Sequence, residues 1–133
     1  MSEKLIDIEL LVSINENEFI ANLVFKNNTD KRVFLDRLTI CYNNKIENNL
    51  FKILDKNNDR VDYKGVMVKR DVSSEDFISI NSGESIETNI ALDEVYKVNK
   101  GNKYTIQYYA YNPSYKDISE LTKLESNKVE VAY

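Results

Sequence analysis

Residues 7–26, DIELLVSINENEFIANLVFK, decide the fold class, because apolar and polar side chains alternate along two successive runs. In the second run the apolar positions are Phe19, Ala21, Leu23 and Phe25. A period of two places such side chains on one face of a β-strand. Between the runs, residues 15–17 (NEN) are typical of a hairpin turn. The stretch therefore predicts two antiparallel strands that each turn one face towards a core.

The rest of the chain continues this pattern in short segments. Further strands are predicted at residues 33–42, 50–54, 63–69, 77–80, 85–92, 104–111 and 128–133. Asn, Asp and Gly residues, which favour turns, separate many of these segments. This spacing favours an all-β fold, an immunoglobulin-like antiparallel β-sandwich of about seven to nine strands. We expect the following side chains to be mostly buried in it: Ile8, Leu10, Leu23, Phe25, Ile90, Ile106 and Tyr108.

Two segments fit the pattern less simply. Residues 63–70, YKGVMVKR, carry a glycine between two β-prone runs and end in two basic residues. We interpret them as a strand in which Gly65 marks a bulge or a close backbone crossing, with Lys69 and Arg70 at its end. Residues 117–123, with Ile118, Leu121 and the adjacent Leu124 at roughly helical spacing, lie between the last two predicted strands. We interpret them as a loop.

Length and charge limit the class of protein. With 133 residues, 42% of them hydrophobic, the chain can bury one core, so we expect a single domain over residues 1–133. The net charge of −4 and the dispersed basic residues argue against binding to nucleic acid or anionic lipid. Acidic residues interrupt the apolar ones in residues 1–13, which predicts neither a signal peptide nor membrane insertion. We expect a cytoplasmic location, with secretion without a cleaved signal left open.

The side chains of common catalytic sites are scarce. The chain has no histidine, which removes the commonest general base and every Ser-His or Cys-His dyad. The single cysteine, Cys41, lies in a predicted strand, so we interpret it as a small buried side chain rather than a reactive thiol. No isolated pair of carboxylates stands out. We therefore expect no enzymatic activity and no cofactor.

One segment begins like a calcium-binding loop. Residues 55–62, DKNNDRVD, have oxygen-bearing side chains at alternate positions from Asp55 to Asp59. Such a loop needs glycine at its sixth position and a bidentate glutamate at its twelfth, where this chain has Arg60 and Val66. We interpret the segment as a turn and expect no metal site in it.

Tyrosines near the C-terminus give the clearest structural and functional candidates. Tyr104 follows a glycine turn and opens an alternating strand, which is typical of a tyrosine corner, where the phenol binds back to a backbone group. Further tyrosines cluster around the last loop. Tyrosine suits binding surfaces because it offers a large contact area with few rotors. The candidate partner-binding residues are therefore Tyr109, Tyr111 and Tyr115, together with Lys69 and Arg70.

Strand alternation also offers a plainer interpretation of these tyrosines. Tyr108 would point into the core, while Tyr109 and Tyr111 would cover the opposite face of the sheet. We favour this interpretation, because it needs no assumption beyond the period of two.

Residues 63–108 resemble a segment from the pro-regions of deuterolysin-like (aspzincin) metalloendopeptidases. Those pro-regions carry a Gly-Val-x-Val-Lys element, an acidic-Phe element followed by Pro-Gly-Glu-Ser, a Leu-x-x-x-Tyr stretch and a Gly-x-Tyr strand. The matching positions here are 65–69, 76–77 with 82–85, Leu92 with Tyr96, and 101–106. Ser82 replaces the expected proline, and one extra residue separates Gly101 from Tyr104.

The resemblance implies a β-sandwich that assists the folding of a peptidase and holds it inactive. Nothing in the chain resembles the peptidase domain, and a chain without histidine has no HExxH motif, so proteolysis is excluded. We therefore expect a non-catalytic module that binds a protein partner, with a peptidase as one candidate, as an inhibitor or chaperone. The alternative is a structural sandwich subunit that self-associates or packs in an assembly.

Overall fold

The computed structural model of the chain describes residues 5–69, 71–117 and 119–133. Within them, the strands are β1 (Asp7–Asn15), β2 (Glu18–Lys26), β3 (Val33–Asp36), β4 (Phe51–Leu54), β5 (Phe77–Ile80), β6 (Ser85–Ala91), β7 (Lys103–Pro113), β8 (Leu121–Glu125) and β9 (Val129–Ala132). The helical segments are η1 (Tyr42–Asn44), η2 (Ser74–Asp76) and α1 (Leu92–Val95). No helix in this described part is long and apolar enough to cross a membrane. The predicted all-β class is confirmed.

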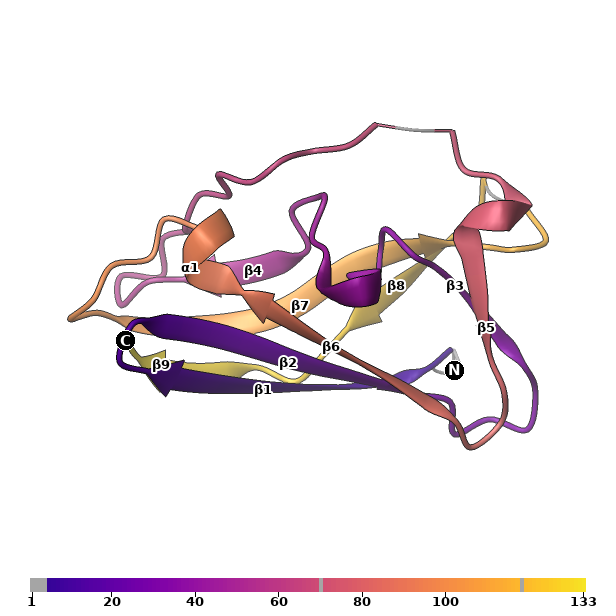
Figure 1. Cartoon of the computed structure of the whole chain (residues 1–133), viewed down its shortest axis with the longest axis horizontal. Helices are drawn as coiled ribbons and strands as arrows, with labels where there is room; N and C mark the ends of the chain where they lie inside the picture. Colours follow the sequence, from indigo (N-terminus) through magenta and orange to yellow (C-terminus); the bar gives the residue numbers. More distant parts are fainter. Residues whose placement is uncertain (1–4, 70, 118) are drawn as a thin grey trace.

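Strands from distant parts of the chain pair to form two main sheets (Figure 1). One sheet has the order β1-β2-β6, and the other has the order β4-β7-β8, with β9 also paired to β7. In the immunoglobulin fold, the first, second, fourth and fifth strands share one sheet, and the third, sixth and seventh share the other. The two main sheets follow this division except that the first lacks a counterpart of the fourth strand. The strands β3 and β5 form a separate antiparallel pair outside this scheme.

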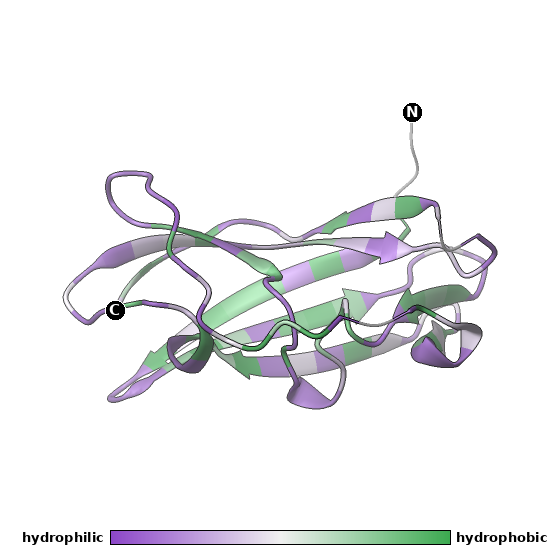
Figure 2. Cartoon of the chain, turned by 90° about the horizontal axis from the view of Figure 1, so that it is seen from above, coloured by the Kyte–Doolittle hydropathy of each residue, from purple (hydrophilic) through white to green (hydrophobic). Residues whose placement is uncertain are grey.

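The core lies between the two sheets and follows the predicted alternation. Hydrophobic and hydrophilic residues alternate along the strands (Figure 2). The hairpin of β1 and β2 closes at the pair Asn15–Glu18, as the sequence predicts. All four inward side chains of β2 are fully buried. Of the side chains predicted to be mostly buried, Ile8 is half-buried and the others are buried: Leu10, Leu23, Phe25, Ile90, Ile106 and Tyr108.

A bulge beside β7 fastens the two sheets together. The strands β8 and β9 pair with the same edge of β7, but their register differs by one residue, so residues 107–108 oppose residues 126–128. Asn127 lies in this bulge, and its side-chain amide binds the main chain of β1. The Leu10 N–H donates to Asn127 Oδ1 at 2.8 Å, and Asn127 Nδ2 donates to the Leu10 carbonyl at 3.1 Å.

The strand predicted at residues 33–42 ends early, at Asp36. The Asp36 carboxylate accepts hydrogen bonds from the Leu38 N–H at 3.2 Å and from the Thr39 hydroxyl at 3.0 Å. Such local bonds favour a turn over a continued strand. Cys41 therefore lies in a turn, with a φ of 55°, rather than in a strand. Its side chain is nevertheless buried, as predicted.

The strand predicted at residues 63–69 is wrong. Residues 64–69, which we name the strap, belong to the long connection between β4 and η2 (Figure 1). Within the part of the chain that the structure describes, the strap has no strand partner. Its main-chain bonds to other described segments run from Lys64 N–H to Val95 O and from Val68 N–H to Glu47 O. β4 cannot pair with it, because β7 covers one edge of β4 while Val61 and Tyr96 bind the other. β-prone residues do not form a strand without such a ladder.

The prediction of a bulge at Gly65 is also wrong, because a bulge requires a paired strand. A Cβ at this position would lie 2.6 Å from Tyr63 Oη, so the close approach is that of a side chain and not of a second strand. The Tyr63 hydroxyl donates a hydrogen bond to the Val66 carbonyl and closes the chain around the glycine. Gly65 therefore leaves room for an aromatic ring.

The loop predicted at residues 117–123 is confirmed at residues 117 and 119–120 and is wrong at residues 121–123, which belong to β8. Residue Leu124 pairs with Ala110 of β7 and is buried, whereas Leu121 is exposed. The near-helical spacing of the leucines does not reflect a helix. Ile118 lies outside the described residues.

The predicted tyrosine corner is confirmed at Tyr104. Its side chain is 5% exposed, the Asn99 N–H donates to Tyr104 Oη at 2.8 Å, and the hydroxyl faces the Asn99 carbonyl at 3.3 Å. The ring also lies against Phe19, with 6.2 Å between the ring centroids. Tyr104 thus holds the connection that leads from α1 into β7.

We expect Tyr104→Phe to lower the free energy of unfolding by about 1–3 kcal/mol, because it leaves the Asn99 N–H without its partner. Tyr104→Ala should cost about 3–5 kcal/mol, since it also creates a cavity. Chemical denaturation measures both changes, with Tyr109→Phe as the control at an outward-facing position of the same strand. Equal midpoints for wild type and Tyr104→Phe would show that the hydroxyl has no structural role.

We expect Asn127→Ala to destabilise the fold by about 1–3 kcal/mol, because two hydrogen bonds to the main chain of β1 are lost together. Lys128→Ala is the matched control, since it alters the next residue of the same bulge. Hydrogen exchange of the Leu10 amide should accelerate in Asn127→Ala. If both variants unfold at the same denaturant concentration, the amide does not hold the sheets together.

Candidate binding site on the outer face of β7 and β8

The alternation of β7 sends two tyrosines to the outer face of the sheet. Tyr108 and Ala110 are buried in the core, whereas Tyr111 is 51% exposed and Tyr109 is half-buried. The hydroxyl of Tyr108 donates to the Thr39 carbonyl at 2.6 Å, which satisfies it within the core. The plainer interpretation of these tyrosines is thus confirmed, and it places Tyr109 and Tyr111 side by side on the surface.

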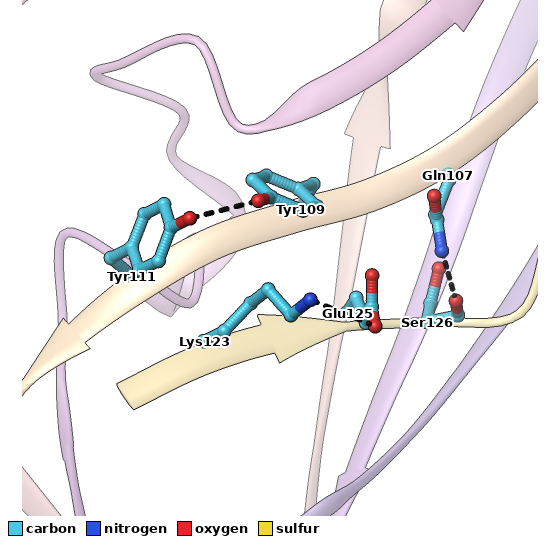
Figure 3. Close-up of polar contacts among 6 residues, drawn as sticks. All are labelled: Gln107, Tyr109, Tyr111, Lys123, Glu125 and Ser126. Carbon is cyan, nitrogen blue, oxygen red and sulfur yellow. Dashed lines mark hydrogen bonds and ion pairs between the residues drawn. The ribbon is translucent and has the colours of Figure 1, made fainter. Parts of the chain in front are cut away.

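Tyr109 and Tyr111 hold each other in place (Figure 3). Their hydroxyl oxygens lie 2.9 Å apart, and their rings meet nearly at right angles with centroids 5.6 Å apart. The hydrogen bond to Tyr111 raises the pKa of Tyr109 above its ordinary value. The two rings therefore form one ordered aromatic surface, which we name the tyrosine pair.

A charged pair on β8 borders the tyrosine pair. Lys123 Nζ lies 5.9 Å from the centre of the Tyr109 ring and 3.5 Å from the Glu125 carboxylate (Figure 3). Further along the same face, Gln107 Nε2 donates to the Ser126 carbonyl at 2.8 Å. The sequence pattern did not indicate Lys123 and Glu125, because it did not predict β8. A strand of five residues with one buried leucine gives only a weak signal of alternation.

A groove of about 340 Å³ lies beside the tyrosine pair, where β4 stops short of the end of β7. Its lining residues are Leu38, Thr39, Asn48, Asn49, Leu50, Tyr109, Ala110 and Tyr111. Apart from the tyrosines, no sequence motif pointed to these residues. Apart from the tyrosines and Ala110, which are part of β7, they come from the turns after β3 and before β4, and only the fold brings them to β7.

The other candidate residues have different surroundings. Tyr115 stacks on Phe34 with 4.1 Å between ring centroids and meets Phe77 edge-on at 5.2 Å, so it covers the β3–β5 pair. Lys69 is exposed in the strap. Arg70 lies outside the described residues. The structure therefore brings together Tyr109 and Tyr111, with partners on β8 that the sequence did not indicate.

The surroundings of the acidic side chains do not resemble a metal centre. Among the described residues, no three His, Cys, Asp or Glu side chains gather as a metal site. Residues 55–62 begin with the predicted turn, in which the Asp55 carboxylate accepts the N–H groups of Asn57 at 2.9 Å and Asp59 at 3.0 Å. A larger hollow of about 430 Å³ adjoins this turn, but opposite charges such as Lys103 and Glu130 line it.

The one thiol is sealed in the core. Cys41 is fully buried, and burial raises the pKa of its thiol from 9.0 to about 12. The thiolate is the nucleophilic form of cysteine, and a raised pKa lowers the fraction of thiolate near neutral pH. This environment suits a packing role.

No protein-family model matches the chain, and no curated protein matches its sequence. The resemblance of residues 63–108 to peptidase pro-regions therefore stays a prediction. In the structure this segment runs from the residue before the strap through β5, β6 and α1 into β7, so it contributes to both main sheets.

We expect the Cys41 thiol of the native protein to resist alkylation by iodoacetamide near neutral pH and to react at once in denaturant. Because folding raises its pKa, the thiol's contribution to stability is fully present below pH 9 and is lost as the pH rises towards 12. Mass spectrometry of timed samples measures the labelling. Rapid labelling without denaturant would contradict the burial of Cys41.

Proposed function

We propose that this chain is a non-catalytic protein-binding module whose partner contacts the tyrosine pair and the adjacent groove. The observation that carries the proposal is the tyrosine pair itself. Its rings are held by a mutual hydrogen bond, and Tyr111 remains 51% exposed. Ordered tyrosines on a surface bind proteins well, because little side-chain entropy is lost when a partner covers them.

The nature of the charges favours a protein partner over nucleic acid. Lys123, the cation beside the tyrosine pair, is already matched by Glu125 at 3.5 Å. The chain carries a net charge of −4, which opposes a polyanionic ligand. Aromatic rings bordered by one balanced ion pair suit a partner that presents apolar and polar groups together.

The non-catalytic part of the proposal rests on the chemistry of the available groups. The sequence offers no histidine, and its one thiol is held protonated in the core. In the tyrosine pair, the pKa of Tyr109 is raised rather than lowered. A tyrosine with a raised pKa does not suit the role of a general base near neutral pH. These features suit binding better than bond chemistry.

The resemblance to pro-regions suggests which partner to test first. A peptidase would be held inactive or assisted in folding, and the module would act as an inhibitor or chaperone. This part of the proposal depends on the resemblance alone, since fold does not determine function.

A second candidate function, self-association as a structural subunit, is favoured by the strap. Three consecutive apolar side chains stand in solvent there: Val66 is 64% exposed, Met67 65% and Val68 38%. Exposed apolar residues in a row are unusual on a monomer and often mark a contact surface. Copies of the chain could cover one another at this position.

One experiment separates the two candidates. Immobilised wild-type chain retains its partner from a lysate, and the retained protein is identified and then titrated against purified variants. We expect Tyr111→Ser to weaken this binding by about 2 kcal/mol, as for a central interface tyrosine, while Met67→Gln leaves it unchanged.

Met67→Gln is the matched control, because it removes from the strap an apolar side chain that is 65% exposed, compared with 51% for Tyr111. If Met67→Gln abolishes association and the retained protein is the chain itself, the structural candidate holds. If Tyr111→Ser binds the partner as tightly as wild type, the tyrosine pair is not the site.

A further inference from the structure

The two edges of β7 are covered unequally. On one edge, β8 and β9 together follow the strand from Lys103 to Pro113. On the other edge, β4 pairs only with Thr105 to Tyr108, and the last bond is from the Tyr109 N–H to the Leu50 carbonyl at 2.8 Å. Among the described residues, the final residues of β7 therefore form a ladder on one side only, and β3 meets this end of β7 through the Asn112 side chain and not through a ladder.

The direction of the main-chain groups at this open edge follows from the alternation of a strand. Tyr108 accepts a bond from Ser126 N–H on the β8 and β9 side, and Tyr109 donates to Leu50 on the opposite side. Two residues further on, the N–H and C=O of Tyr111 must point to the same side as those of Tyr109. Among the described residues, neither group has a partner there.

The chain itself turns away from this edge. If β4 extended backwards in register, Asn48 would oppose Tyr111. Instead, the Asn49 N–H donates to Asn48 Oδ1 at 2.8 Å, and Asn49 Oδ1 accepts the Tyr96 hydroxyl at 2.7 Å. Because of these bonds, residues 48–49 line the groove and do not continue β4 along β7. Pro113, which has no N–H to offer, limits the open edge at its far end.

We propose that an extended polypeptide segment adds to β7 at Tyr111, antiparallel to it and in line with β4. This inference rests on the proposed function and specifies the partner's chemistry. One donor and one acceptor, spaced as in a strand, match the main chain of another strand. Successive side chains of the segment would point alternately outward onto the tyrosine pair and inward towards Leu38 and Thr39 in the groove. Apolar, β-branched side chains fit both directions.

The test uses a capped six-residue peptide of alternating threonine and valine as the probe. Its control is the same peptide with alternate backbone nitrogens methylated, which cannot form the ladder. We expect the first peptide alone to shift the amide resonances of Tyr109 to Tyr111 and of Leu38, and to slow hydrogen exchange at Tyr111. The protein is the full chain in both titrations.

Two variants distinguish the contribution of the Tyr111 main chain to peptide binding from that of its ring. Tyr111→Val and Tyr111→Pro both remove the ring, but only proline removes the N–H. We expect Tyr111→Pro to bind the peptide about five- to tenfold more weakly than Tyr111→Val, the effect of one hydrogen bond. Both variants should unfold at similar denaturant concentrations, because edge positions tolerate proline.

Each contrary outcome overturns the inference. Equal peptide binding by the two variants would mean that the tyrosine surface, and not the strand edge, makes the contact, and the proposed function would stand without this refinement. Unfolding of Tyr111→Pro alone would mean that the N–H is bonded inside the fold. If no peptide binds and Tyr111 becomes protected only as protein concentration rises, the occupant is a second copy of the chain.

Discussion

Main-chain hydrogen-bonding groups along the edges of short strands are the constraint on which this sandwich depends. Where no neighbouring strand is present, side chains supply the missing partners. Asn127 binds both main-chain groups of Leu10 and so joins β1 to the bulge between β8 and β9. Asn112 binds main-chain groups of two residues of β3: its Oδ1 accepts the Asp36 N–H at 2.8 Å, and its Nδ2 donates to the Phe34 carbonyl at 3.3 Å. The asparagines that break the sequence pattern thus also act as links between sheets.

The candidate site differs from these closed strand edges. The edge of β4 is closed at Phe51 by the Tyr96 hydroxyl, at 3.0 Å. The edge of β6 is closed at Asn89, whose N–H donates to Asn44 Oδ1 at 2.8 Å. At Tyr111, in contrast, the edge of β7 meets a groove. That this opening adjoins an ordered aromatic surface is the basis of the proposed interaction with an extended protein segment.

The sequence anticipated features that depend on local pattern. The side chains of β2 alternate without exception, and Tyr104 follows the glycine turn that a tyrosine corner requires. For the site, the same alternation placed Tyr109 and Tyr111 on the outer face. It could not indicate Lys123, because β8 has too few inward apolar residues, nor the groove, whose walls come from turns distant in sequence.

By itself, the sequence determined the all-β class, the hairpin of β1 and β2, and the face on which each long strand buries its side chains. These properties follow from a period of two and from turn chemistry, which act over a few residues. Only the tertiary structure decided that the β-prone strap forms no strand and that residues 121–125 do. A strand exists only where a neighbour offers its edge, and the position of that neighbour is set by the whole fold.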